Sequence, residues 1–463
     1  MRTLLNQKQV AITVDLNFRR PLQEYVALTL TLTLTLTYRG TSLESPSTGL
    51  SWETPNEISW SGAPQVALAL ASTSMLLSRH ASSVRISRIR VFQMDLPLHE
   101  AAYKWAGGKS VATFDATLVK VETDVPGLSG WGEVTPLGSA YLASFAAGAR
   151  AGLRELAPKL LGLNPLEITA VNLVMDRELK GHGYVKSPID VALHDIVGKA
   201  FGCSVSTLLG GVCSSGGSVP LYRAISQDTP DNMVRNVDKF IAEGYRRFQL
   251  KVGSKDVDGD IARIRMVRAL LDERSRQAGE PSMLLMCDAN TGWRRDEALR
   301  VINGCRDLDV YIEQPCASYE ECRDVRRSCP LPMILDECID DVGSLVRAAG
   351  DGACDMINLK ISKVGGLSKA RALRDLACSL GVPMNIEDTW GGDIVTCAIS
   401  HLAASCPPAF LVCATDFNSY GPVTMGETSA RRRGGLLRAP TEPGLGIKVD
   451  EAALESRLQF EVA

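Results

Sequence analysis

The feature that most constrains the fold of this chain is a regular alternation that begins near residue 215. Eight short runs rich in Val, Ile, Leu and Met recur between amphipathic stretches of helical length, at residues 219–225, 246–252, 283–289, 309–315, 332–337, 356–362, 383–388 and 410–416. Helix candidates between them include residues 230–243, 260–272 and 367–380, the last followed by Gly381 as a capping residue. Such βα units form parallel sheets, and eight in succession close naturally into an α/β barrel.

A smaller domain precedes the predicted barrel. Residues 84–97 and 112–122 have the character of strands, and residues 146–161 have the pattern of a helix. We therefore expect an α+β capping domain at residues 85–215 and a catalytic barrel at residues 216–430. A C-terminal segment at residues 431–463 is expected to return to the capping domain.

The first 84 residues follow neither pattern. They contain a Leu-Thr alternation at residues 28–37 and a stretch rich in Ser, Pro and Gly at residues 42–61, so we expect a poorly ordered extension. The alternation is too polar to span a membrane, and Asp15 and Glu24 interrupt any secretory signal. The basic, acid-free residues 75–90 resemble an organelle transit peptide only if translation begins at Met75. The prediction is a cytoplasmic protein, with organelle transit as the alternative.

The composition excludes several classes of partner. The chain has 463 residues and a net charge of −3, and its Lys and Arg residues are scattered rather than clustered. This pattern gives no electrostatic footprint for a nucleic acid or an anionic membrane surface. The 13 cysteines form no CxxC pair, which favours reduced thiols over a disulfide framework. We expect a small-molecule substrate and neither a nucleic acid nor a membrane partner.

Polar residues close most of the predicted strands. Asp288, Glu313 and Asp336 end three consecutive runs, and Lys251 and Lys360 end runs on either side. The C-terminal ends of barrel strands meet at one mouth, so these side chains should be neighbours in space. Three carboxylates suit Mg²⁺, and two lysines facing each other could accept and donate a proton on opposite faces of a substrate. A lone Asp is more often a helix cap and a lone Lys a loop charge, but neither interpretation explains consecutive acids flanked by lysines.

The segments around these positions resemble the enolase superfamily, in its muconate-lactonizing branch. They are SPIDVALHDIVGK at 187–199, FQLKVG at 248–253, DAN at 288–290, EQP at 313–315, DE at 336–337 and NLKISKVGG at 358–366. The resemblance extends from about residue 84 to the C-terminus, and it implies a modified TIM barrel of (β/α)7β type with an α+β capping domain. It also implies Mg²⁺ held by Asp288, Glu313 and Asp336, with Lys251 and Lys360 as the acid/base pair. Members often form dimers or octamers, so a homo-oligomer is implied as well.

One position departs from the branch. Gln249 stands where the first lysine of a Lys-x-Lys motif is usual, and in the family that lysine supports the second one electrostatically. The resemblance therefore leaves open how the pKa of Lys251 is tuned here. The departure and the unusual N-terminal extension also leave open a catalytically inactive barrel with a binding or structural role.

Four further segments resemble cis-3-hydroxy-L-proline dehydratases and the related hydroxyproline-betaine epimerases. They are YKWAGGK at 103–109, YRAIS at 222–226, EDTWGGD at 387–393 and TDFNSY at 415–420. Substrate contacts are predicted for Tyr103, Lys104, Trp105, Tyr222, Gln249, Asp388, Trp390 and Asp416. Asp388 could pair with a ring ammonium group, while Trp390 could lay an aromatic face on the same charge or simply pack in its loop. The 103–109 loop resembles a lid over the mouth.

The reaction implied by this resemblance is an anti elimination. In cis-3-hydroxy-L-proline the α-hydrogen and the 3-hydroxyl lie on opposite ring faces, so loss of water needs a base on one face and an acid on the other. Mg²⁺ on the carboxylate would stabilise the ene-diolate, and the product enamine would tautomerise to Δ1-pyrroline-2-carboxylate. The same pair of lysines could instead run a racemase or epimerase of proline betaine or hydroxyproline betaine. The sequence does not assign the base and the acid between the two lysines.

Overall fold

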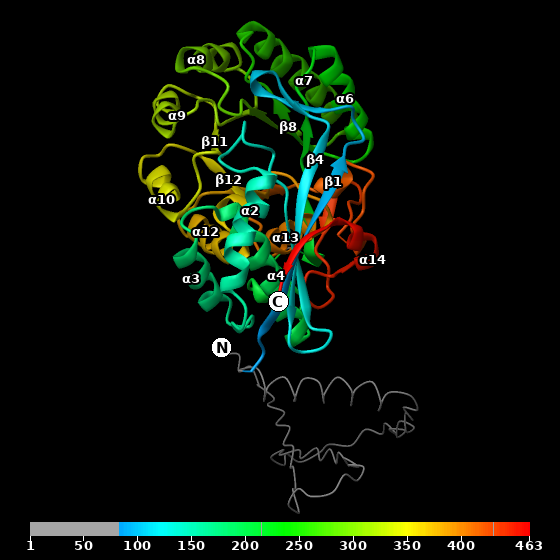
Figure 1. The fold of residues 1–463 in the computed structure, drawn as a ribbon. Helices are drawn as coiled ribbons and strands as arrows, with labels where there is room; N and C mark the ends of the chain where they lie inside the picture. The colour runs from blue at the N-terminus through cyan, green and yellow to red at the C-terminus, as the bar shows by residue number, and fades with distance from the viewer. Residues whose placement is uncertain (1–82, 214, 429) are drawn as a thin grey trace, which may run out of the picture. The chain divides into compact units, whose positions relative to one another are not determined.

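The computed structural model describes residues 83–213, 215–428 and 430–463. The predictions for residues 1–82 therefore lie outside the described residues. Residues 83–90 of the possible transit segment are described, and residues 86–90 belong to strand β1 (Ile86–Pro97). The described chain has the predicted mixed α/β fold, in which an eight-stranded parallel sheet is joined by a four-stranded antiparallel sheet (Figure 1).

The larger sheet contains eight strands in chain order, and every neighbouring pair is parallel. They are β7 (Arg223–Ile225), β8 (Arg247–Lys251), β9 (Leu284–Asp288), β10 (Tyr311–Glu313), β11 (Met333–Leu335), β12 (Met356–Lys360), β13 (Met384–Glu387) and β14 (Leu411–Ala414). A parallel bridge from Leu221 to Ala414 brings the first strand beside the last, so the sheet curls back on itself. Strands four apart in this order, such as β8 and β12, therefore face each other across the barrel.

A helical segment connects each pair of consecutive barrel strands, and the helices cover the outside of the sheet (Figure 1). They are α6 (Pro230–Ala242), α7 (Val257–Ala278), α8 (Arg295–Gly304), α9 (Tyr319–Arg326), α10 (Val342–Gly350), the short α11 (Ile361–Val364) with α12 (Leu367–Ser379), and α13 (Asp393–Ala404). Local sequence sets their starts. Thr229 caps α6 ahead of Pro230, and Asp341 caps α10. The helices leave the C-terminal ends of the strands open toward the capping domain.

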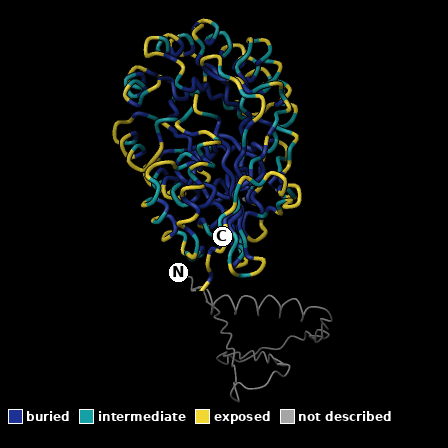
Figure 2. The backbone as a smooth tube through the Cα atoms, in the orientation of Figure 1, coloured by how far each residue is buried: buried dark blue, intermediate teal, exposed yellow. Residues whose placement is uncertain are grey.

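The capping domain is built on the antiparallel sheet β18–β1–β4–β5. Its strands are β1 (Ile86–Pro97), β4 (Thr113–Thr123), β5 (Ser129–Val134) and β18 (Leu458–Val462), and its helices are α2 (Ala146–Leu156), α3 (Ile168–Glu178) and α4 (Gly183–Phe201). Glycines at 130 and 132 let β5 lie directly on α4, because a Cβ at Gly132 would come within 1.8 Å of the Pro188 carbonyl oxygen. Buried backbone fills the interior of the described chain, while the exposed residues lie in outer loops and helix faces (Figure 2).

The remaining elements are short. They are the hairpin β2 (Tyr103–Trp105) and β3 (Lys109–Val111) around η1 (Ala106–Gly108), the pairs β6 (Ser218–Pro220) with β16 (Leu436–Arg438) and β15 (Gly426–Thr428) with β17 (Ile447–Val449), the helices α5 (Val205–Leu208) and α14 (Glu451–Leu454), and the 3-10 turns η2 (Ala157–Lys159), η3 (Ser215–Gly217), η4 (Phe417–Ser419) and η5 (Glu455–Arg457).

Three predicted elements differ by more than two residues from those in the structure. The run at residues 219–225 is not one strand, because its first part pairs with β16 and only β7 joins the barrel. The helix predicted at 146–161 ends at Leu156, where Pro158 can no longer supply a helical N–H and the chain tightens into η2. Helix α7 extends beyond the predicted 260–272, since Asp256 caps its start and Gly279 adopts the left-handed conformation at its end.

Candidate active site

Two lysines face each other across the mouth of the barrel. Lys251 ends β8 and Lys360 ends β12, on opposite sides of the curled sheet, and the two residues are only 6% and 5% exposed. The ammonium group of Lys251 pairs with Asp288, and that of Lys360 pairs with Asp336. Each buried cation therefore has a carboxylate partner on the side that faces the centre of the mouth.

Three carboxylates occupy the strands between these lysines. Asp288 and Glu313 end β9 and β10, Asp336 directly follows β11, and all three are fully buried. Asp288 lies in register with Lys251 on one side and with Glu313 on the other, which places the three side chains on adjacent strands. The predicted acids and lysines thus converge on one mouth.

The backbone turns sharply just after two of these acids. Asn290 and Gln314 adopt positive φ values of 41° and 35°, a conformation that costs free energy for residues other than glycine. Gln314 is buried, and its side-chain oxygen accepts a hydrogen bond of 2.9 Å from the backbone N–H of Asp336. The strained turn after β10 therefore also fixes the third acid.

Amide side chains hold Glu313. Gln249 Nε2 donates to both of its oxygens, at 2.9 and 3.1 Å, and Asn358 Nδ2 donates at 2.6 Å. Burial and the negative charge of Asp288 raise the pKa of Glu313 well above its ordinary value. Gln249, which replaces the usual lysine, thus supports the central acid rather than placing a second cation beside Lys251.

These residues fit a hard divalent cation by their chemistry. Among the residues that the structure describes, no three acidic, histidine or cysteine side chains converge on a common point at ligand distances. Their oxygens instead accept hydrogen bonds, from Lys251, Lys360, Lys363, Gln249 and Asn358. Ammonium groups against Asp288 and Asp336 show that the acids stabilise positive charge at this place, and an all-oxygen donor set suits Mg²⁺.

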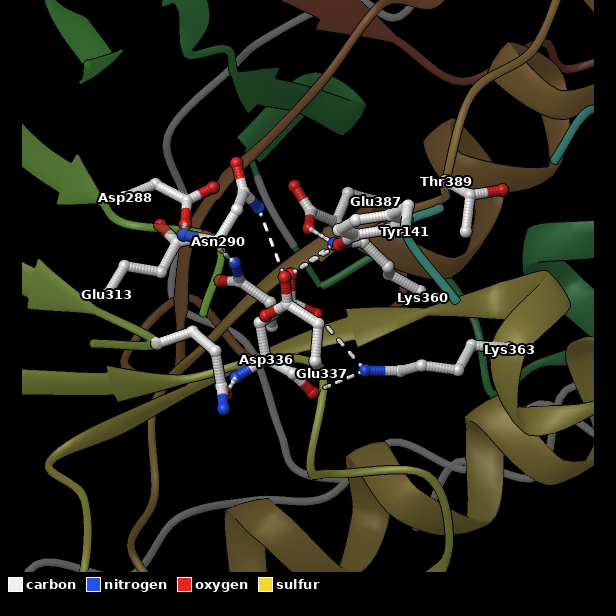
Figure 3. A network of polar contacts seen from close by, with 12 residues as sticks. Tyr141, Asp288, Asn290, Glu313, Asp336, Glu337, Lys360, Lys363, Glu387 and Thr389 are labelled. Atoms are coloured by element: carbon white, nitrogen blue, oxygen red, sulfur yellow. Dashed lines mark hydrogen bonds and ion pairs between the residues drawn. The ribbon is translucent and has the colours of Figure 1, made fainter. Parts of the chain in front are cut away.

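Three residues around Lys360 were not predicted from the sequence. Lys360 Nζ donates to the Tyr141 hydroxyl at 2.8 Å and lies 2.9 Å from Glu387 Oε1, while Lys363 reaches Asp336 Oδ1 at 3.1 Å (Figure 3). The Tyr141 hydroxyl in turn donates to Asp336 Oδ2 at 3.0 Å. Glu387 could have been found as the last residue of a barrel strand, but nothing in the sequence around Tyr141 indicates that a capping-domain loop enters the mouth.

A small cavity of about 30 Å³ lies between the two lysines. Five of the eight predicted substrate contacts line it, namely Tyr103, Tyr222, Gln249, Asp388 and Trp390. The hydroxyl of Tyr222 also donates to Glu387. A void of this size holds roughly two waters, so side chains must move before a ring-sized ligand enters.

Asp388 and Trp390 form one wall of this cavity. The Asp388 carboxylate accepts hydrogen bonds from Ser362 Oγ, the Ser362 N–H at 3.0 Å and the Thr389 N–H at 2.7 Å, and burial raises its pKa to about 6. The Trp390 ring stacks on Phe114, with centroids 4.0 Å apart, and meets Tyr103 at 4.9 Å. Trp390 is therefore both a packed aromatic residue and part of the cavity lining.

The other three predicted substrate contacts do not line the cavity. Lys104 is exposed, because it alternates with buried Tyr103 along β2 and only its backbone docks on the barrel, at Ser226 and Gln227. Trp105 is buried at the end of β2, next to the turn of the hairpin.

Asp416 follows β14, and it points to different neighbours. It accepts a hydrogen bond of 3.1 Å from the Tyr245 hydroxyl and lies 3.7 Å from Arg432 Nε. A polar residue after a barrel strand can therefore serve packing between loops rather than the mouth.

A larger cavity of about 550 Å³ lies beside the mouth, between the capping domain and the barrel. Capping-domain residues such as Leu142 and Tyr184 line one side, and Glu337, Lys363 and Thr389 line the other. Thr389 also lines the small cavity, so the two spaces adjoin. All 13 cysteines are free, and no helix of the described residues is long and apolar enough to cross a membrane.

Comparison with known families agrees with this geometry. Residues 232–453 match the family model described as "Enolase C-terminal domain-like", and residues 90–210 match "Mandelate racemase / muconate lactonizing enzyme, N-terminal domain". A cis-3-hydroxy-L-proline dehydratase from Roseibium aggregatum is 53% identical over 364 residues, which cover 79% of this chain and 96% of that protein. An N-succinyl-L-Arg/Lys racemase from Bacillus cereus is 26% identical, over 82% of this chain and 99% of that protein.

Solved structures agree as well. A mandelate racemase/muconate lactonizing enzyme from Roseovarius nubinhibens is 40% identical with a TM-score of 0.77, covering 82% of this chain and 99% of its own. Another structure from that organism, 35% identical with a TM-score of 0.77 and coverages of 82% and 100%, is complexed with magnesium. The resemblance predicted from the strand-end motifs is thereby confirmed. The chain belongs to the enolase superfamily, in its mandelate racemase/muconate-lactonizing branch, and is an enzyme of that superfamily.

Proposed function

We propose that this enzyme is a Mg²⁺-dependent dehydratase that converts cis-3-hydroxy-L-proline into Δ1-pyrroline-2-carboxylate and water. The observation that carries the proposal is the placement of Lys251 and Lys360 on strands that face each other, with a cavity between them. Anti elimination needs this arrangement, because the α-hydrogen and the leaving hydroxyl lie on opposite faces of the ring. The dehydratase from Roseibium aggregatum, at 53% identity, adds support for this substrate.

The proposed steps use the two lysines in different protonation states. Burial lowers the pKa of each lysine, but Asp288 beside Lys251 and Asp336 beside Lys360 raise it well above its ordinary value, so the lysine that acts as base must first part from its carboxylate. One neutral lysine removes the α-proton, and the other, as an ammonium group, donates a proton to the 3-hydroxyl, which leaves as water. The bond between the α- and β-carbons becomes double, and the resulting enamine then gains a proton at the β-carbon and loses one from the ring nitrogen, which gives the cyclic imine. Both lysines are buried, so water competes poorly for these proton transfers.

Asp288, Glu313 and Asp336 are the residues that would hold Mg²⁺. When bound, the ion supplies positive charge that offsets the substrate carboxylate and makes the adjacent proton more acidic. Asp388 would pair with the ring ammonium group at the other end of the substrate, and Trp390 would cover it. These contacts would fix the ring with one face toward each lysine.

The test is to incubate the purified enzyme with Mg²⁺ and cis-3-hydroxy-L-proline and to follow the cyclic imine. The matched substrate is trans-3-hydroxy-L-proline, in which the hydroxyl and the α-hydrogen share a face, so the anti route is closed. Imine from the cis isomer at a rate at least about a hundredfold above the trans isomer is expected. Equal rates with both isomers, or no imine from either, would contradict the proposal.

A racemase or epimerase is the second candidate, because two lysines on opposite faces can remove a proton from one side and return it on the other. The similarity to a relative named as an N-succinyl-L-Arg/Lys racemase supports this second candidate. Loss of optical rotation, or exchange of the α-proton with deuterium from the solvent, in proline betaine or hydroxyproline betaine without imine formation would select it.

A further inference from the structure

The loop that carries Asp388 and Trp390 is held from the capping domain. It connects β13 to α13, and Thr389 Oγ1 donates a hydrogen bond of 3.1 Å to the backbone oxygen of Thr135, just beyond β5. The ring of Trp390 stacks on Phe114, which belongs to β4. Two strands of the capping sheet therefore contact this single barrel loop.

A buried carboxylate fixes the far end of the same loop. Glu133, in β5, is 2% exposed, and its two oxygens accept hydrogen bonds from the N–H groups of Gly392, at 2.6 Å, and Val395, at 3.0 Å. Thr135 Oγ1 donates to the same carboxylate at 2.8 Å. Every one of these partners is a donor, which orients both oxygens toward the loop and helix.

Gly392 and Val395 are the N-cap and the third residue of α13, whose first N–H groups have no partner within the helix. The N-cap is a glycine, so it has no side chain to accept these hydrogen bonds. Glu133 supplies the missing cap from another domain, and above its pKa of about 7, where the group is ionised, its negative charge lies at the positive end of a 12-residue helix. The start of α13 is thus placed by the capping domain and not by its own sequence.

We propose that Glu133 is a positioning residue for substrate binding: by capping α13 from the capping domain, it holds Asp388 and Trp390 at the cavity wall. The identity of the ligand rests on the proposed function, whereas the mechanical link does not. Loss of the link loosens the ammonium end of the site while the lysines and acids stay in place. The Michaelis constant therefore rises more than the turnover number falls.

The test compares Glu133→Gln with the matched control Asp195→Asn in the full chain with Mg²⁺. Asp195 is also a buried carboxylate that accepts a backbone N–H of β5, from Trp131 at 3.0 Å, but its other hydrogen bonds go to Lys199 and Leu445. In Glu133→Gln an amide NH₂ group replaces one of the two acceptor oxygens, so it faces a backbone N–H group that needs an acceptor. We expect amide hydrogen exchange over residues 388–396 to rise at least tenfold, and KM for cis-3-hydroxy-L-proline to rise roughly tenfold with kcat changing less than threefold.

Asp195→Asn is expected to leave exchange over residues 388–396 and KM unchanged, even if its melting temperature falls. Thr135→Val, which keeps the carboxylate but removes one donor, should give a smaller rise in the same segment, and it serves as the second variant if Glu133→Gln does not fold. Unaltered exchange over 388–396 in the Glu133 and Thr135 variants, or an equal rise in KM in Asp195→Asn, overturns the proposal. If the wild-type enzyme does not dehydrate cis-3-hydroxy-L-proline, the proposed substrate fails, and the exchange measurement alone decides the role of Glu133.

Discussion

The charge of Asp388 should control the affinity of the enzyme for a cationic substrate. Its carboxylate lines the cavity, is 4% exposed and has a pKa raised to about 6 by burial, an effect that the nearby Lys360 partly opposes. Above pH 6 the group is ionised and can pair with a ring ammonium. Protonation removes that charge, so kcat/KM is expected to fall as the pH drops through about 6.

The magnitude follows from the burial of the pair. Removing one partner of a buried ion pair costs about 3 kcal/mol or more, which corresponds to a factor of roughly 10² in affinity. Asp388→Asn should therefore raise KM about a hundredfold. The N–H groups of Ser362 and Thr389 donate to different oxygens of the carboxylate, so the amide oxygen can accept from only one of them and the new NH₂ faces the other. The melting temperature of Asp388→Asn is therefore measured together with KM, to show that the variant is folded.

The assay is the initial rate of imine formation between pH 5 and pH 9, at saturating Mg²⁺, for the wild type and Asp388→Asn. In the wild type, kcat/KM should fall about tenfold per pH unit below pH 6, and in the variant kcat/KM should not show this fall. Ser362→Ala, which keeps the charge and removes one hydrogen bond, is the control and should raise KM less than about fivefold. A variant that retains this fall, or loses less than threefold in kcat/KM, would refute the assignment of Asp388 as the ammonium partner.

Four other outcomes are expected. Lys251→Ala and Lys360→Ala should each lower kcat at least about 10²-fold while calorimetry still detects Mg²⁺ binding, and unchanged kcat in either would exclude that lysine from proton transfer. Treatment with a chelator should abolish turnover and added Mg²⁺ should restore it. Tyr141→Phe loses a hydrogen bond to Lys360 and another to Asp336, so kcat should fall about tenfold with little change in melting temperature. Burial raises the pKa of Glu133 from 4.5 to about 7, so the folded state binds the proton of this group more tightly than the unfolded state does. The unfolding free energy of the wild type, relative to that of Glu133→Gln, should therefore fall by about 3 kcal/mol as the pH rises from 4.5 to 7. Parallel pH profiles of the two proteins in calorimetry would contradict this.

The barrel and its central site were predictable because one physical rule links them. Strands buried on both faces must be apolar along their length, so a charged residue at the end of such a run stands out. Asp288 follows Leu284, Leu285, Met286 and Cys287 in β9, and Lys360 similarly ends β12. Because the strand ends of a barrel share one mouth, the run endings predicted that Asp288, Glu313, Asp336 and the two lysines lie near one another.

The same rule could not decide where each polar group points. Asp416 also follows a barrel strand, yet its carboxylate is engaged by Tyr245. Gln249 was recognised as a missing lysine, but its two hydrogen bonds to Glu313 depend on the register between strands. Such directions are set by pairing and by side-chain partners that lie far away in the sequence, and a strand-end pattern contains neither.

The capping domain contributes more to the site than a lid, and the sequence gives no local sign of this. Tyr141 reaches between Lys360 and Asp336, and Glu133 caps the helix that follows the Asp388 loop. On the proposed function, the barrel positions the groups that would transfer protons and hold charge, whereas the capping domain positions the groups that would contact the remote end of a ligand. Interactions with that remote end set mainly the affinity for the ligand, whereas the acids and lysines set the chemical step. A change of substrate can then arise from the β4–β5 sheet and the loop after it, while the acids and lysines of the barrel, and hence proton abstraction next to a carboxylate, stay the same.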